Sequence, residues 1–345
     1  MKKAKRKSMR TVVILIVIAL LIAVWIGSRM NWAVRSYSFH PDLPAPGVSM
    51  DFKYDDVFAD LYIRWCNFYD HLLTESWRAP DSVVKKSLSV TARDGYQIGG
   101  YILEPEGCEG EVLPTMLYCH GGAFFLTMMN CQLDLGAIYA EQLHCRVILP
   151  EYRTSLDHPY PVPVYDCFDV LQWIAKSEET DTGHVMIYGD SAGGCLAALV
   201  TQMCMDEKLL LPCSQMLIYP VTDTSQDYPS LTTYENTTWT REGNLRMWKL
   251  FLRGKEPAEG DYAVPMLRED FEGFPRTYVE VAEMDTLYDQ GLAYAEKMQN
   301  GGVDVSTVTA EGAYHGFDGP TENSYVQEML WGRISWLKEA LEESV

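Results

Sequence analysis

The chain has 345 residues, of which 47% are hydrophobic and 22% are charged, a composition typical of a globular protein with a large core. Its formal net charge is −20, from 48 acidic and 28 basic residues. An acidic surface repels nucleic acids, so no nucleic-acid partner is expected, and the acidity is explained by solubility.

The N-terminus departs from this acidic character. The first 35 residues hold eight Lys or Arg and no acid, and an uncharged run rich in Ile, Leu and Val covers residues 11–27. The run predicts a transmembrane anchor, with the basic residues 1–10 on the cytoplasmic side and the following domain outside the cytoplasm. A cleaved signal peptide, giving a secreted protein, is the alternative. The nine cysteines form no C-x-x-C pair and argue mildly against export.

The elements that follow are a linker, a helical stretch and a long alternating region. Several Pro and Gly residues break residues 28–50, whereas apolar residues recur at helical spacing in residues 51–79. From residue 83 onward strands and helices alternate, which predicts a mostly parallel sheet of about eight strands covered on both faces. The expected strands are residues 86–92, 97–104, 115–119, 146–150, 184–188, 215–219, 277–281 and 305–310. The expected helices are residues 132–143, 163–175, 192–205, 289–299 and 324–341.

One insertion interrupts the alternation. Residues 221–273 are rich in Trp and Tyr and contain one expected helix, residues 242–253. The insertion is expected to lie over a pocket as part of a cap, and an ordinary surface helix is an equal alternative.

The strongest motif is Gly189-Asp190-Ser191-Ala192-Gly193. It follows an expected strand and precedes an expected helix, the context of a nucleophile elbow. Small residues are needed on both sides of Ser191 because the two backbone segments nearly touch there. Ser191 is therefore the predicted nucleophile.

A glycine motif lies about 70 residues before this serine, directly after the expected strand that ends at residue 119. In His120-Gly121-Gly122 the glycine N–H groups can point into a cavity without a Cβ in the way. Acyl transfer passes through an oxyanion that needs such donors. We expect Gly121, Gly122 and the N–H of Ala192 to form the oxyanion hole.

A serine nucleophile also needs a base and a carboxylate to orient that base. His315 is the only histidine after Ser191 and is the predicted base. Asp285 follows an expected strand and is the first candidate for the acid, with Glu283 and Asp289 as nearby alternatives.

These motifs resemble the hormone-sensitive lipase family of α/β-hydrolases, which includes carboxylesterases and an arylacetamide deacetylase branch. The resemblance covers roughly residues 85–335 and includes Glu151-Tyr152-Arg153, residues 285–291 and Tyr314-His315-Gly316-Phe317. Departures are Leu156-Asp157 and Thr286, where the family has Pro-Glu and Pro. The resemblance implies an α/β-hydrolase fold over residues 83–345, with Asp285 as the acid. It also implies a helical cap from residues 51–82 together with the 221–273 insertion.

The function expected from these residues is carboxylic-ester hydrolysis through a Ser-His-Asp triad and an acyl-enzyme, on small short- to medium-chain acyl or acetyl esters. The alternatives are a non-catalytic ligand-binding protein on the same scaffold and an amide or peptide hydrolase. The sequence carries no clustered Cys and His and no phosphate-binding glycine loop of the G-x-x-x-x-G-K type, so neither a metal nor another cofactor is expected.

Overall fold

The computed structural model describes residues 37–46, 57–234 and 237–343. Its centre is a sheet with the order β1-β3-β5-β4-β6-β7-β8-β9, in which β2 pairs with β3 beside this path. The β1–β3 and β3–β5 pairs are antiparallel, and every pair from β5 through β4 to β9 is parallel. The strands are β1 (Val83–Ser87), β2 (Val90–Thr91), β3 (Gln97–Pro105), β4 (Leu113–Cys119), β5 (Arg146–Glu151), β6 (Thr180–Asp190), β7 (Ser214–Ile218), β8 (Thr277–Ala282) and β9 (Val305–Ala310).

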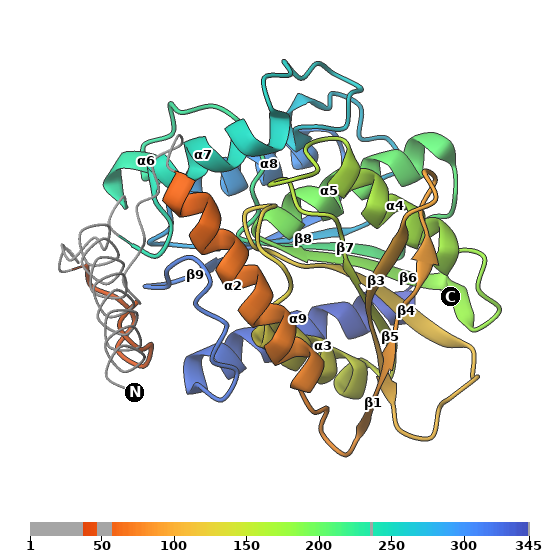
Figure 1. Ribbon diagram of the computed structural model, residues 1–345. Helices are drawn as coiled ribbons and strands as arrows, with labels where there is room; N and C mark the ends of the chain where they lie inside the picture. Colours follow the sequence, from red (N-terminus) through yellow and green to blue (C-terminus); the bar gives the residue numbers. More distant parts are fainter. Residues whose placement is uncertain (1–36, 47–56, 235–236, 344–345) are drawn as a thin grey trace, which may run out of the picture.

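Helices cover both faces of this sheet (Figure 1). One face carries α4 (Val162–Ile174), α5 (Ala192–Glu207) and α8 (Tyr288–Asn300), and the other carries α3 (Asn130–Leu143) and α9 (Ser324–Glu343). Alternate side chains of β6 enter the two cores: Val185 and Ile187 pack with α4 and α5, whereas Met186 and Tyr188 pack with α3 and α9. A strand buried on both faces has a continuous apolar sequence, and this explains the run before Gly189.

The predicted mostly parallel sheet with two helical layers is confirmed, and each expected strand and helix has a counterpart. One expected strand, residues 86–92, is two strands. The Leu88 N–H donates to the carbonyl of Gly100 between them, so β1 pairs with residues 101–105 of β3 and β2 pairs with residues 97–98. The sheet therefore has nine strands rather than about eight.

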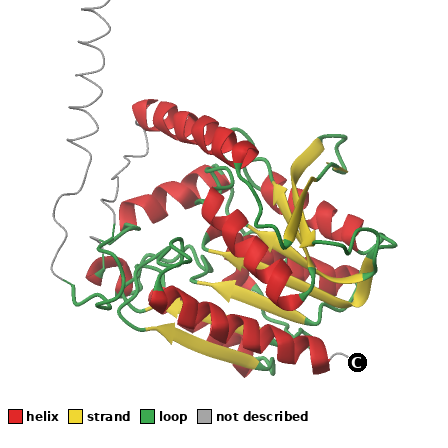
Figure 2. Ribbon diagram, turned by 90° about the horizontal axis from the view of Figure 1, so that it is seen from below, coloured by secondary structure: helices red, strands yellow, loops and turns green. Residues whose placement is uncertain are grey.

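Two parts of the chain lie outside these layers. The first is α2 (Val57–Ser76), the outermost helix at the top of Figure 2. The second is the insertion, which contains α6 (Ser230–Thr233), α7 (Arg241–Leu252) and the 3-10 turn η1 (Pro265–Leu267). Neither α6 nor η1 was predicted from the sequence. An ion pair between Arg246 of α7 and Asp60 of α2 joins the two parts.

The described part of the expected linker packs on the domain. The His40 N–H donates to the carbonyl of Gly312 at 2.9 Å, and Leu43 is buried. The expected anchor, residues 11–27, and the basic residues 1–10 lie outside the described residues. Within the described ranges, no helix combines the length and apolar character needed to cross a bilayer. All nine cysteines are described and none forms a disulfide.

Candidate active site

Ser191 occupies the sharp turn between β6 and α5, with φ 56° and ψ −121°. A positive φ is strained for a residue that carries a Cβ, so the surroundings must hold it. The Ser191 N–H donates to the carbonyl of Ile218 at 2.9 Å, and the Ser191 carbonyl accepts from the Val221 N–H at 3.0 Å. Both partners lie at or just beyond the end of β7, so the neighbouring strand fixes the turn.

The glycines around Ser191 are required by close backbone packing. A Cβ on Gly189 would lie 2.1 Å from the carbonyl oxygen of Gly193. A Cβ on Gly193 would lie 2.0 Å from the carbonyl oxygen of Cys119, the last residue of β4. The motif thus brings the start of α5 into contact with the segment that begins the His120-Gly121-Gly122 loop.

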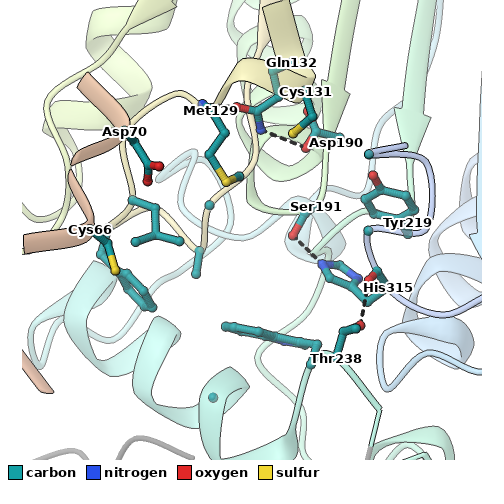
Figure 3. Close-up of a pocket in the computed structure, with 18 of the residues that line it drawn as sticks. Cys66, Asp70, Met129, Cys131, Gln132, Asp190, Ser191, Tyr219, Thr238 and His315 are labelled. Carbon is teal, nitrogen blue, oxygen red and sulfur yellow. Dashed lines mark hydrogen bonds between the residues drawn. The ribbon is translucent and has the colours of Figure 1, made fainter. Parts of the chain in front are cut away.

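His315 and Asp285 complete a chain of hydrogen bonds that begins at Ser191. The Ser191 Oγ lies 2.8 Å from His315 Nε2, and His315 Nδ1 lies 2.6 Å from Asp285 Oδ2 (Figure 3). Asp285 is fully buried, and its other oxygen accepts from the Leu287 N–H at 3.0 Å. With the Nδ1 proton shared with this carboxylate, Nε2 is free to accept the serine proton.

The two alternative carboxylates have other partners. Glu283 accepts from the Gly312 N–H at 2.7 Å, and Asp289 accepts from the Ser230 N–H at 2.7 Å. Neither interaction involves His315, so of the three candidate acids only Asp285 is paired with the imidazole.

The loop that begins His120-Gly121-Gly122, called the glycine loop below, differs from expectation in one N–H donor. The Gly121 N–H donates to Asp190 Oδ2 at 3.1 Å and is therefore already engaged. Gly122 and Ala123 line the cavity beside Ser191, whereas Gly121 does not. Among the described residues, the N–H groups of Gly122, Ala123 and Ala192 have no acceptor. Those three N–H groups are therefore free to donate to a ligand at Ser191, whereas the N–H of Gly121 is not.

Asp190, to which the sequence motif assigns no role, holds the glycine loop in place. It is buried, and burial together with the nearby carboxylate of Asp318 raises its pKa to about 6. A Cβ on Gly121 would lie 2.3 Å from Asp190 Oδ2, which explains why this position is glycine. Burial lowers the pKa of the nearby His120 to about 4, because it disfavours the charged imidazolium, so this imidazole is neutral near pH 7.

A buried ion-pair network supports the loop that carries His315. Arg333 of α9 is fully buried and contacts Asp318 at 2.8 Å and Glu280 of β8 at 2.5 Å. Asp318 also accepts a hydrogen bond from the Tyr219 hydroxyl, and the Tyr219 ring lies edge-on to His315 with centroids 4.8 Å apart. These contacts fasten the histidine loop to β8 and to the loop after β7.

The cavity at Ser191 has a volume of about 540 Å³ and is closed on one side by α2 and the insertion. Ile63 and Cys66 of α2 and Trp239 of the insertion lie in its wall, together with residues of the glycine loop. Thr238 of the insertion also donates through Oγ1 to the carbonyl of His315 at 2.6 Å (Figure 3). The sequence contained no local signal for this contact, because the two residues are 77 positions apart.

A family model described as alpha/beta hydrolase fold matches residues 116–319, more than half of the chain. The chain belongs to this α/β-hydrolase family. An esterase from Gibberella moniliformis strain M3125 is 30% identical over 230 residues, which cover 62% of this chain and 72% of the esterase. Lipase 2 from Moraxella sp. strain TA144 is 29% identical over 234 residues, which cover 59% of this chain and only 54% of the lipase.

A solved structure, titled Bacterial Heroin Esterase, has the same fold. It superposes with a TM-score of 0.76 at 26% identity and covers 88% of this α/β-hydrolase and 98% of its own chain. The relatives and this structure confirm the expected fold and the expected enzyme class, a carboxylic ester hydrolase.

Proposed function

We propose that this α/β-hydrolase cleaves short- to medium-chain acyl or acetyl esters through an acyl-enzyme formed on Ser191. The observation that carries the proposal is the unbroken hydrogen-bond chain from Ser191 through His315 to the buried Asp285. A protein that only binds ligands has no need of a strained serine, a base and a buried carboxylate in one line.

In the proposed mechanism, His315 Nε2 takes the hydroxyl proton as Ser191 Oγ attacks the ester carbonyl. The resulting oxyanion is held by the N–H groups of Gly122, Ala123 and Ala192, each stabilising the transition state by about 3 kcal/mol. His315 then gives its proton to the leaving alcohol. Water enters, His315 removes a proton from it, and the resulting hydroxide attacks the acyl carbonyl. The bond between the acyl carbon and Ser191 Oγ then breaks, His315 returns its proton to Oγ, and the acid leaves.

The proposed substrate size rests on the cavity. Its volume of about 540 Å³ is in the range of sites for small molecules. Apolar and aromatic side chains form much of the cavity wall, including Phe125, Leu126 and Trp239. Such a wall suits an acyl chain or an aryl group better than a charged peptide.

The proposed location is a membrane, with residues 11–27 as a single anchor, residues 1–10 in the cytoplasm and the hydrolase domain outside it. The proposal rests on the uncharged run and the basic residues before it. Protease treatment of intact cells should digest the domain and leave the first residues protected. Resistance of the domain until the cells are lysed would contradict this topology.

The catalytic proposal is tested by labelling the full chain with a fluorophosphonate probe and by assaying a p-nitrophenyl ester series of rising acyl length. Ser191→Ala should abolish both labelling and hydrolysis, whereas Ser89→Ala, a change at an exposed serine, should leave both unchanged. Full esterase activity in the Ser191→Ala variant would show that another group is the nucleophile. Preference for the longest acyl chains would contradict the proposed substrate size.

A further inference from the structure

The outer side of α2 exposes a stripe of large apolar side chains. Its members, defined here as the α2 stripe, are Leu61, Trp65, Phe68, Tyr69 and Leu72. Each is between 48% and 63% exposed, and together they are five of the eleven exposed large hydrophobic side chains among the described residues. At about 100° per residue these five positions fall within a sector of about 100° around the helix, so they form one continuous strip.

The opposite side of the same helix is fixed to the active site. Ile63 is 1% exposed and lines the cavity with Cys66 and Asp70, which point inward from α2 (Figure 3). The Asn67 side chain donates to the carbonyl of Phe125 at 2.9 Å and accepts from the Thr127 N–H at 3.2 Å. The helix is thus held in one orientation, and the α2 stripe cannot turn inward without breaking these contacts.

The charged residues of α2 lie beside the stripe or away from it, and most are already engaged. Asp60 pairs with Arg246, Arg64 pairs with Asp157, and Glu75 accepts from the Tyr101 hydroxyl. No acidic or basic residue stands within the sector of the α2 stripe itself. An uncharged strip of Trp, Tyr, Phe and Leu has the composition that favours the boundary between lipid headgroups and acyl chains.

The short segment between the apolar run and the hydrolase domain favours a bilayer over a protein partner. The apolar run ends at residue 27, and the chain is packed on the domain from Tyr37, whose hydroxyl donates to the carbonyl of Thr233. Ten residues span at most about 35 Å, so an anchored run would hold the domain close to the bilayer. This step rests on the proposed anchor, whereas the α2 stripe does not.

We propose that the α2 stripe lies in the headgroup region of a lipid bilayer and that the active-site cavity consequently stands next to the membrane surface. Because acidic residues outnumber basic ones by 48 to 28, the matching surface is zwitterionic rather than anionic. Esters dissolved in the bilayer would then reach the enzyme without first entering bulk water.

The test is photo-crosslinking of the full chain in phosphatidylcholine vesicles. Phe68 is replaced by p-benzoylphenylalanine, and the matched control carries the same replacement at Trp331, which is 53% exposed on α9. Irradiation should attach lipid at position 68 and not at position 331. Absence of lipid at position 68, equal labelling at both positions, or crosslinking to a second copy of the chain would overturn the proposal.

A second measurement uses the double variant Trp65→Ser and Phe68→Ser, because neither residue lines the cavity. Its rate on a bilayer-dissolved ester should fall by about tenfold, while its rate on a water-soluble acetate ester stays within about twofold of the parent. Equal loss on both substrates would contradict the proposal. The crosslinking result does not depend on catalysis, so failure of the proposed Ser191 chemistry would be recognised separately.

Discussion

Replacing Gly193 by alanine is expected to disrupt both stability and catalysis, because the new methyl group has no room. The added Cβ would lie 2.0 Å from the carbonyl oxygen of Cys119 and 2.5 Å from the carbonyl carbon of His120. Both atoms belong to backbone, so no side-chain rotation can relieve the contact. Relief requires α5 to move away from the end of β4 by more than 1 Å, roughly the shortfall from van der Waals contact.

The size of the effect follows from that displacement. Overpacking by a methylene group usually costs about 1–3 kcal/mol, and a backbone clash in a fully buried turn should exceed about 4 kcal/mol. The same movement would separate the glycine loop from Ser191, so we expect hydrolysis of p-nitrophenyl acetate to fall by at least about a hundredfold.

The matched control is Gly332→Ala in the interior of α9, where an added Cβ meets no atom within 4 Å. This change should stabilise the protein by about 0.5–1 kcal/mol, because alanine loses less backbone entropy on folding. Urea unfolding of the three proteins gives the comparison. A Gly193→Ala protein within about 1 kcal/mol of the parent and with half of its activity would refute the steric reasoning.

Three further changes test the contacts around the site. Thr238→Val should lower kcat about tenfold with little change in the urea midpoint, because the hydrogen bond to the carbonyl of His315 is lost. Thr238→Ser keeps the hydroxyl and should retain activity. An unchanged kcat in the valine variant would exclude a positioning role for Thr238. The raised pKa of Asp190 means that ionisation of this carboxyl destabilises the folded state, and the cost grows as pH rises from 3.8 to about 6. The free energy of unfolding of Asp190→Asn should therefore rise by about 1–1.5 kcal/mol relative to that of the parent between about pH 5 and about pH 8. A pH-independent difference would contradict this. Arg333→Met should lower the free energy of unfolding in urea by about 3–5 kcal/mol, because two buried carboxylates lose their cation. Arg64→Met, at a half-exposed ion pair, should lower it by less than about 1 kcal/mol. Equal losses of stability in the two variants would refute the burial argument.

The sequence predicted those features of the site that depend on local chemistry. The turn around Ser191 needs small residues and a strand-to-helix junction, and both can be recognised within one short segment. His315 was identified because no other histidine follows the serine. The strand order could be anticipated only in outline, since pairing is decided by contacts between distant segments. The division of residues 86–92 into β1 and β2 arises from such pairing with β3.

The features of the site that sequence reasoning missed are long-range. Gly121 was expected to donate to the oxyanion, yet its N–H is engaged by Asp190, 69 positions away. That interaction leaves the N–H of Ala123 as the second loop donor of the proposed oxyanion hole, although a residue with a Cβ and a φ of 54° would not be chosen from sequence. The contact from Thr238 to His315 belongs to the same class, because a cap residue acquires its role only when the insertion folds over the sheet.

The strained turn at Ser191 has a consequence for the order of folding. The backbone of Ser191 is hydrogen-bonded to Ile218 and Val221. Gly193 packs against Cys119 at the end of β4. The turn therefore needs β4 and β7 in place on either side of β6. A chain that has formed helices but not these strand pairs has no means to keep the serine at positive φ. Recovery of esterase activity during refolding should therefore lag behind recovery of helical circular dichroism and report the final alignment of the sheet.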